Sequence, residues 1–167
     1  MYYADASRVC LEPCVPYGWQ FPDEDVFMPS AKGKGLNCFG LLTRTNKLMF
    51  STTTQNINST FVFEYLDRLS FMLEKPTVIV LDNASVHTAK IIQKQRKVWE
   101  ERGLILFYLP PYSPQLNLIE ILWKMLKYYW LKPEDYAEEQ LLFYKITLAL
   151  AAVGSSLNIN FSDLALV

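Results

Sequence analysis

The stretch VIVLDNASVHTAK, residues 78–90, places an aspartate, an asparagine and a histidine directly after a run of apolar residues. The run is β-branched and does not alternate with polar residues, which is typical of a strand buried on both faces in a parallel sheet. We therefore predict a central strand over residues 77–82 with Asp82 at its carboxyl end. Open α/β sheets gather their ligands at that edge.

The segments around this strand predict strands that alternate with helices. Between Ser59 and Pro76, apolar residues recur at helical spacing, and a second helix is predicted over residues 86–102. A fully apolar run over residues 104–109 predicts another strand. Because strands connected through helices pair parallel by right-handed crossovers, we expect the strand 104–109 to run parallel to the strand 77–82.

The amino-terminal part predicts further strands of opposite direction. Residues 1–5 resemble a short strand that ends at an aspartate, and residues 36–43 and 47–54 resemble an antiparallel hairpin. Residues 11–35, between the first strand and the hairpin, are dense in proline and glycine, which predicts a long loop. These three strands, together with those predicted over residues 77–82 and 104–109, predict a mixed five-stranded sheet.

The carboxyl-terminal part predicts two helices. After PPYSPQ, an apolar stripe recurs at spacings of 3, 4, 3 and 4, formed by Leu116, Ile119, Trp123, Leu126 and Trp130. A last helix is predicted over about residues 135–153. The predicted fold class is therefore α/β, with a mixed five-stranded sheet flanked by helices.

Composition narrows the range of functions. With 167 residues, 51% of them hydrophobic, the chain is long enough for one domain with a substantial core, and a net charge of -1 argues against coating nucleic acid by bulk electrostatics. The three cysteines, Cys10, Cys14 and Cys38, form no CxxC pair, so we expect a reduced, cytoplasmic protein without a disulfide framework or zinc site. The most apolar stretch, residues 141–153, is too short to span a membrane.

Three acidic residues are the candidate catalytic groups. Taken singly, Asp82 could cap the following helix, and Glu120 could form a surface pair with Lys124. If the first strand lies beside the strand 77–82, however, Asp5 and Asp82 converge and the helix after PPYSPQ can bring Glu120 to them. Three converging carboxylates repel unless a cation holds them, and an oxygen-only site suits Mg²⁺ or Mn²⁺. Two such ions would serve phosphodiester displacement.

Three motifs carry a resemblance to a known family. YADAS, VIVLDNASVH and LPPYSPQLNLIEILWKMLK resemble the catalytic domain of IS630-type transposases, in the IS630/Tc1/mariner group of DDE recombinases, over about residues 1–150. The resemblance implies a ribonuclease H-like fold for a single catalytic domain over residues 1–167, with Asp5, Asp82 and Glu120 as the metal-binding triad. The chain departs from the family at Ala6, where a second acid is common, and at Leu118, where a proline is usual.

The resemblance also implies a reaction and its partners. The expected reaction is cleavage of DNA at the ends of a mobile element, with water as the nucleophile, followed by strand transfer by the freed 3′ hydroxyl, dependent on two Mg²⁺ or Mn²⁺ ions. Relatives carry a helix-turn-helix region before the catalytic domain. None precedes Tyr2, so an upstream region or frame is expected to supply it. A homodimer on DNA, nucleoid-associated in a bacterium, is expected.

Five residues are candidates for DNA contact: Asn83, His87, Asn117, Lys124 and Lys127. The lysines continue the helix face of the third acid, where they could neutralise phosphates. Each candidate also has an ordinary structural explanation, since asparagines favour turns and helix starts, a lone histidine is more often structural, and lysines solvate helix faces.

Two alternatives remain open at this stage. One is a non-transposase nuclease of the same fold, acting on RNA–DNA hybrids or structured DNA. The other is a catalytically inactive, truncated transposase that serves as a binding or dimerisation module through the helix over residues 135–153.

Overall fold

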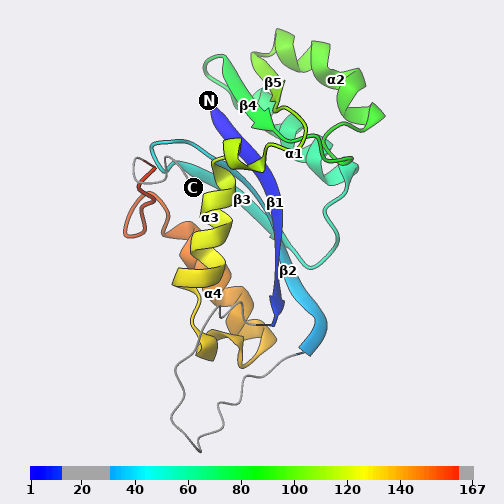
Figure 1. The fold of residues 1–167 in the computed structure, drawn as a ribbon. Helices are drawn as coiled ribbons and strands as arrows, with labels where there is room; N and C mark the ends of the chain where they lie inside the picture. Colours follow the sequence, from blue (N-terminus) through cyan, green and yellow to red (C-terminus); the bar gives the residue numbers. More distant parts are fainter. Residues whose placement is uncertain (13–30, 162–167) are drawn as a thin grey trace, which may run out of the picture.

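A mixed five-stranded sheet with the strand order β3-β2-β1-β4-β5 forms the centre of the molecule in the computed structural model, which describes residues 1–12 and 31–161 (Figure 1). The strands are β1 (Tyr2–Leu11), β2 (Ala31–Leu42), β3 (Leu48–Thr53), β4 (Thr77–Leu81) and β5 (Leu104–Tyr108). β1, β2 and β3 pair antiparallel in succession, whereas β1 with β4 and β4 with β5 pair parallel. The predicted mixed sheet is thereby confirmed.

Helices cover both faces of this sheet (Figure 1). They are α1 (Ser59–Phe71), α2 (Lys90–Glu101), α3 (Ile119–Met125) and α4 (Glu139–Ala151), with the 3-10 turns η1 (Pro114–Leu116) and η3 (Pro133–Tyr136) and the π-helical turn η2 (Leu126–Trp130). Side chains alternate along each strand, so Ile79 packs in the core with α1 and α2, whereas Val80 packs in the core with α3 and α4. The sheet thus separates two apolar layers.

The sheet forks at β1. Its parallel ladder with β4 contains only the pairs Tyr2 with Ile79 and Tyr3 with Val80, whereas its antiparallel ladder with β2 continues to Leu11. The prediction that the first strand ends at Asp5 is therefore wrong, because the early start of β2 provides a partner for the rest of β1. The loop predicted over residues 11–35 is likewise too long at both ends, and its residues 13–30 lie outside the described part of the chain.

Three predicted helices differ in their boundaries. α2 begins at Lys90, not at residue 86, because the N–H groups of His87 and Thr88 both bond to the carbonyl of Ala84 in a turn that precedes the helix. The helix predicted after PPYSPQ is divided into η1, α3 and η2. The last predicted helix is divided into η3 and α4, because Glu138 has an extended backbone (φ -140°, ψ 147°).

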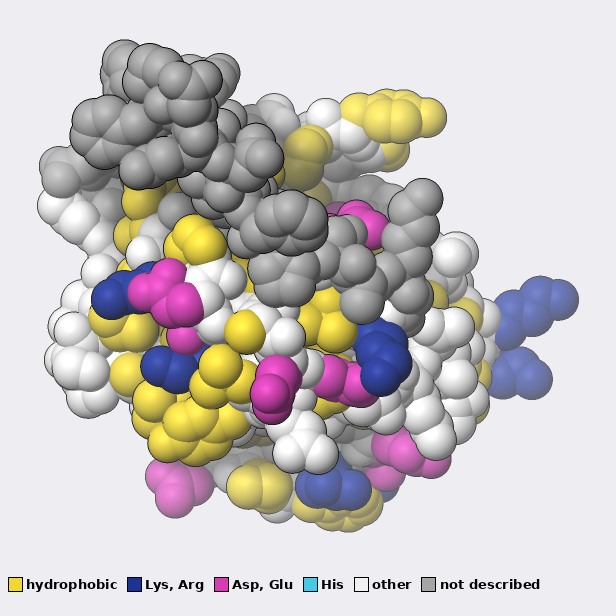
Figure 2. All heavy atoms as spheres, turned by 90° about the horizontal axis from the view of Figure 1, so that it is seen from below, with side chains coloured by type: hydrophobic (Ala, Val, Ile, Leu, Met, Phe, Trp, Pro, Cys, Tyr) yellow, Lys and Arg dark blue, Asp and Glu magenta, His cyan; other side chains and the backbone are white. Residues whose placement is uncertain are grey.

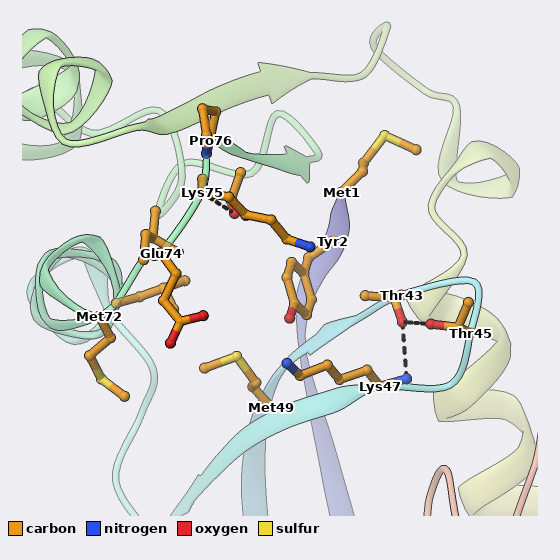
Figure 3. Close-up of a pocket in the computed structure, with 13 residues that line it drawn as sticks. Met1, Tyr2, Thr43, Thr45, Lys47, Met49, Met72, Glu74, Lys75 and Pro76 are labelled. Atoms are coloured by element: carbon orange, nitrogen blue, oxygen red, sulfur yellow. Dashed lines mark hydrogen bonds between the residues drawn. The ribbon is translucent and has the colours of Figure 1, made fainter.

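Away from the fork, the surface of the molecule combines apolar, acidic and basic side chains. A cavity of about 450 Å³ lies at the amino ends of β1 and β4, lined by Tyr2, Met49 and Lys47 among others (Figure 3). Near α4, Lys34 pairs with Glu139 at 2.8 Å, and Figure 2 shows basic and acidic side chains interspersed among apolar ones on the face that it views. Neither charge sign dominates on that face.

Within the described ranges, no helix has the length and apolarity to cross a bilayer.

Candidate active site

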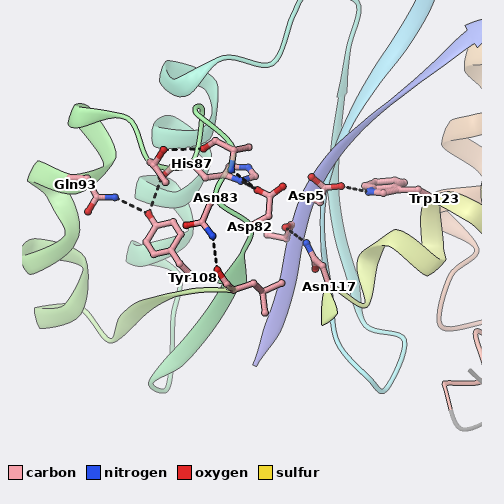
Figure 4. A network of polar contacts seen from close by, with 12 residues as sticks. Asp5, Asp82, Asn83, His87, Gln93, Tyr108, Asn117 and Trp123 are labelled. Carbon is pink, nitrogen blue, oxygen red and sulfur yellow. Dashed lines mark hydrogen bonds and ion pairs between the residues drawn. The ribbon is translucent and has the colours of Figure 1, made fainter. Parts of the chain in front are cut away.

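Two aspartates project toward the same face of the sheet where it forks. Tyr3 and Val80, which form the last pair of the β1–β4 ladder, both pack in the core beneath α3. Asp5 and Asp82 follow them by two residues each, and side chains two apart on extended backbone lie on the same face. Figure 4 shows the two carboxylates turned toward one another. The predicted convergence of Asp5 and Asp82 therefore has a structural basis.

Glu120 lies in the first turn of α3, the helix that covers this face. The pKa of Asp5 is raised to about 7, mainly by burial and further by the negative charges of Glu120 and Asp82. Partial burial likewise raises the pKa of Glu120, with the Asp82 charge adding to it, while Lys127 and a hydrogen bond with Asp5 act in the opposite direction. The three carboxyl groups thus lie within one another's electrostatic field.

Asp82 differs from the other two acids because His87 holds it in the charged form. The Oδ1 atom of Asp82 lies 2.6 Å from His87 Nδ1 and accepts the N–H of Ala84 at 3.1 Å. The hydrogen bond with His87 is the main cause that lowers the pKa of Asp82, against a smaller effect of burial. Asp82 does not cap the next helix, since α2 begins at Lys90 without a side-chain cap.

His87 and Asn117 are buried, which disagrees with the expectation that they contact DNA directly. His87 is 1% exposed and Asn117 is 3% exposed. Asn117 donates to the carbonyl of Ala4 at 3.2 Å, which attaches the loop before α3 to the strand of Asp5. Both side chains face the protein, so their position favours a role in orienting the aspartates.

Asn83 also has an intramolecular partner, because its Nδ2 donates to the carbonyl of Leu109 at the end of β5 (Figure 4). Tyr108 donates its hydroxyl to the carbonyl of His87 at 2.8 Å and accepts from Gln93 at 3.1 Å. These bonds tie the turn after β4 to β5 and α2, which fixes the backbone on which Asp82 is mounted.

The two candidate lysines have different surroundings. Lys124 is exposed, whereas Lys127 is half-buried and close enough to lower the pKa of Glu120. Among the ion pairs of the described residues, none joins Glu120 to Lys124, so the ordinary surface pair considered from the sequence does not form. Both lysines remain available to phosphate groups.

A cavity of about 350 Å³ opens beside Asp82, between the turn after β4 and the loop that follows β5. Asp82 and Asn83 line one side, and residues 109–114 line the other. Tyr112 in that loop is fully exposed and has a left-handed backbone conformation, with φ 57°, which is uncommon outside glycine. An aromatic ring therefore stands free at the rim of the site.

Trp123 is the site residue that the sequence pattern concealed. Its indole Nε1 donates to Asp5 Oδ2 at 3.1 Å (Figure 4), yet the spacing of apolar residues identified it only as part of a core stripe. One signal was present: an indole N–H on a buried helix face needs an acceptor, and Asp5 was already a candidate for the same face.

The residues fit a divalent cation by donor type. Three carboxylates, two of them with raised pKa through burial and mutual repulsion, are the oxygen ligands that Mg²⁺ and Mn²⁺ prefer. In residues 1–12 and 31–161, no three His, Cys, Asp or Glu side chains are drawn together as a finished ligand set. The donor chemistry of the site thus suits a divalent cation, although the three carboxylates are not close enough together to form a complete ligand set.

Comparison with known proteins agrees with this arrangement. The family model described as DDE superfamily endonuclease matches residues 1–142. The chain belongs to this superfamily. No curated protein has a significantly similar sequence. The endonuclease domain is nevertheless similar in fold to several solved structures.

One such structure is the simian T-cell lymphotropic virus intasome in complex with PP2A regulatory subunit B56 gamma, with a TM-score of 0.60 and 16% identity over 82% of this chain and 49% of that one. Two others are Mos1 mariner paired-end complexes. The complex with Mn has a TM-score of 0.57 and 13% identity, covering 90% of this chain and 52% of that one. The complex with Mg has a TM-score of 0.54 and 13% identity, covering 93% and 54%.

The endonuclease domain therefore has the ribonuclease H-like fold that the resemblance predicted. It spans about half the length of the transposase and intasome chains that it matches.

Proposed function

We propose that this DDE endonuclease domain is the catalytic domain of an IS630-type DNA transposase, which cleaves phosphodiester bonds at the ends of a mobile element and joins them to target DNA. The observation that carries the proposal is the convergence of Asp5, Asp82 and Glu120, from β1, the end of β4 and α3, in one electrostatic field. The family match and the similarity to transposase and intasome folds support it.

Asp5, Asp82 and Glu120 would hold the cations, Mg²⁺ or Mn²⁺, and we propose two of them. Bound there, the cations would supply the charge that activates the attacking oxygen and stabilises the leaving oxygen of the phosphodiester. The protein's part is orientation: His87 holds one oxygen of Asp82, and Trp123 holds one oxygen of Asp5. The matched Mos1 complexes with Mn and Mg support this choice of metal.

DNA would approach across α3 and the rim of the cavity beside Asp82. Lys124, on α3, and Lys127, in η2, follow Glu120 and would contact phosphates near the scissile bond. The free ring of Tyr112 stands at the rim, where a nucleobase could stack on it. Asn83 lines the same cavity, although its amide is engaged by Leu109.

The remaining parts of the proposal concern partners. We propose that a helix-turn-helix region, on a longer chain or a separate one, recognises the element ends, and that two catalytic domains act together on paired ends. Such an assembly works where chromosomal DNA lies, in the cytoplasm and at the nucleoid if the host is a bacterium.

Nicking of supercoiled plasmid tests the proposed chemistry. The wild-type domain should convert supercoiled DNA to the open circle with Mg²⁺ or Mn²⁺ and not with EDTA. Asp82→Asn should lose this activity while keeping the far-UV and near-UV circular dichroism of the wild type. Equal nicking by the two proteins would refute the assignment.

A substrate panel separates this proposal from a nuclease of another specificity. Duplex DNA, an RNA–DNA hybrid and a DNA hairpin of matched length should be offered under the same conditions. Preferential cleavage of the hybrid would favour a ribonuclease H activity instead.

A further inference from the structure

Trp123 bonds the helix that carries Glu120 to the side chain of Asp5. Three residues after Glu120, it lies on the same side of α3, and it is 3% exposed. Its Nε1–H donates to Asp5 Oδ2 at 3.1 Å. Within the described chain, no Lys or Arg forms an ion pair with Asp5, and the indole N–H donates to this half-buried carboxylate in place of a cation. The helix of Glu120 is thereby attached to the strand of Asp5.

Gly40 provides the space for this contact. It is the residue of β2 that pairs directly with Asp5 across the antiparallel ladder. A Cβ atom at Gly40 would lie 3.0 Å from Ile119 Cδ1 and 3.1 Å from Trp123 Cη2, closer than ordinary van der Waals contact. A Cβ atom here would require the Ile119 and Trp123 side chains to move by a few tenths of an ångström. The glycine lets α3 approach the sheet closely enough for the Trp123 ring to cover this position and reach Asp5.

A second hydrogen bond between a tryptophan and an aspartate, outside the candidate site, provides a comparison. Trp99 donates to Asp67 at 2.9 Å, but Asp67 also pairs with Arg102 at 2.9 Å. The charge of Asp67 is thus neutralised within the protein. Asp5 has the same indole donor without the cation, and it faces two further carboxylates.

We propose that Trp123, lying over Gly40, is a positioning residue for Asp5 that sets the spacing between the Asp5 and Glu120 carboxylates for cation binding. This inference rests on the proposed function. The indole N–H bonds to Oδ2 and so restrains the side-chain rotamer of Asp5. Because the same helix carries Glu120, a displacement of the ring moves both acids relative to one another.

Mn²⁺ binding to the whole chain, measured by electron paramagnetic resonance of free Mn²⁺, tests the inference without DNA or turnover. Trp123→Phe keeps an aromatic ring and removes the N–H donor. It should weaken Mn²⁺ binding by about 10- to 100-fold, as loss of a ligand-orienting hydrogen bond does. Trp99→Phe is the matched control, because it also removes one indole donor from an aspartate, and it should leave Mn²⁺ affinity unchanged.

Gly40→Ala is the second variant, and it decides the matter if Trp123→Phe does not fold. It keeps Asp5, Glu120 and Trp123 but shifts the side chains that pack over this position, Trp123 among them, so it too should weaken Mn²⁺ binding. Wild-type affinity in a folded Trp123→Phe or Gly40→Ala protein, with binding lost in Asp82→Asn, would overturn the positioning role and leave the proposed function intact. A wild-type protein that binds no Mn²⁺ and nicks no plasmid would instead remove the proposed function itself.

Discussion

Asp5 and Asp82 occupy equivalent positions on neighbouring parallel strands, since each follows by two residues the last pair of the β1–β4 ladder, Tyr3 with Val80. The ladder stops at this pair, so the two acids lie just beyond the last paired residues, where the strands begin to separate. The register of this short ladder therefore determines that both side chains reach the α3 face. A shift of one residue would turn one of them to the opposite face.

Removing the Asp5 charge should stabilise the protein above neutral pH. The pKa of Asp5 is raised from 3.8 to about 7, so between these values the unfolded chain releases a proton that the folded chain keeps. The free energy of unfolding therefore falls as pH rises through this window, and the full penalty is present above pH 7. Asp5→Asn should raise the free energy of unfolding by about 1–3 kcal/mol at pH 8 and by little at pH 4. Urea unfolding at both pH values measures the difference.

Divalent cations should reverse this penalty in the wild type. A ligand that binds only the folded state at 100 times its Kd stabilises by about 2.7 kcal/mol, which raises Tm by about 5–10 °C for a domain of this size. Differential scanning fluorimetry with MnCl₂ should show this rise for wild type and not for Asp82→Asn. An equal rise in both proteins would mean that Mn²⁺ binds elsewhere.

Replacing His87 should impair catalysis more than stability. His87→Phe keeps the ring volume in a buried position but removes the bond to Asp82 Oδ1. The Asp82 side chain is 42% exposed and regains water, so the expected loss is only about 1 kcal/mol of unfolding free energy. Plasmid nicking should fall about 10- to 100-fold. Unchanged nicking would show that the turn after β4 orients Asp82 without the imidazole.

The lysines after Glu120 should contribute to the salt dependence of DNA binding. Each phosphate contact contributes about -0.9 to the slope of log K against log salt, so Lys124→Gln and Lys127→Gln should each flatten that slope by about one. Fluorescence anisotropy of a labelled duplex between 50 and 200 mM salt, chosen as roughly the range over which such contacts weaken, measures it. Lys47→Gln, in the cavity at the opposite edge of the sheet, is the control that should leave the slope unchanged.

Tyr112 should matter to DNA and not to the fold. Its side chain is fully exposed, so Tyr112→Ala should leave Tm unchanged. Loss of one stacking ring typically costs about 1–3 kcal/mol per base in single-strand binding, which the anisotropy of a labelled oligonucleotide would detect. Equal affinity of the two proteins would exclude a stacking role.

The succession of strands and helices was predictable because it is encoded locally. The apolar run before Asp82, and the glycines and prolines that interrupt regular structure, are recognisable in the sequence alone. The length of β1 was not predictable, because the partner that extends it, β2, begins at Ala31 within a stretch of glycines and lysines. Strand ends depend on distant partners, which local composition does not reveal.

The candidate acids were also predictable, whereas the groups that orient them were not. Asp82 follows a recognisable strand, and Glu120 lies within the most specific motif. The sequence pattern places Trp123 in an apolar stripe, and it leaves His87 as a group that could reach a phosphate or the metal site or could be structural. Trp123 bonds to an aspartate 118 residues away, a contact that appears only once α3 packs on β1. His87 bonds to Asp82 within the turn after β4, and the conformation of that turn is what brings the two side chains together.

The order of the three acids along the chain has a consequence during synthesis. Asp5 leaves the ribosome before α3, which carries Glu120, covers β1 and β2, and follows more than a hundred residues later. A nascent or prematurely terminated chain can form the β1–β2–β3 meander without ever possessing the helix that completes the cutting centre. The three acids can therefore meet only after α3 has been translated, so the proposed DNA cleavage would require nearly the whole domain.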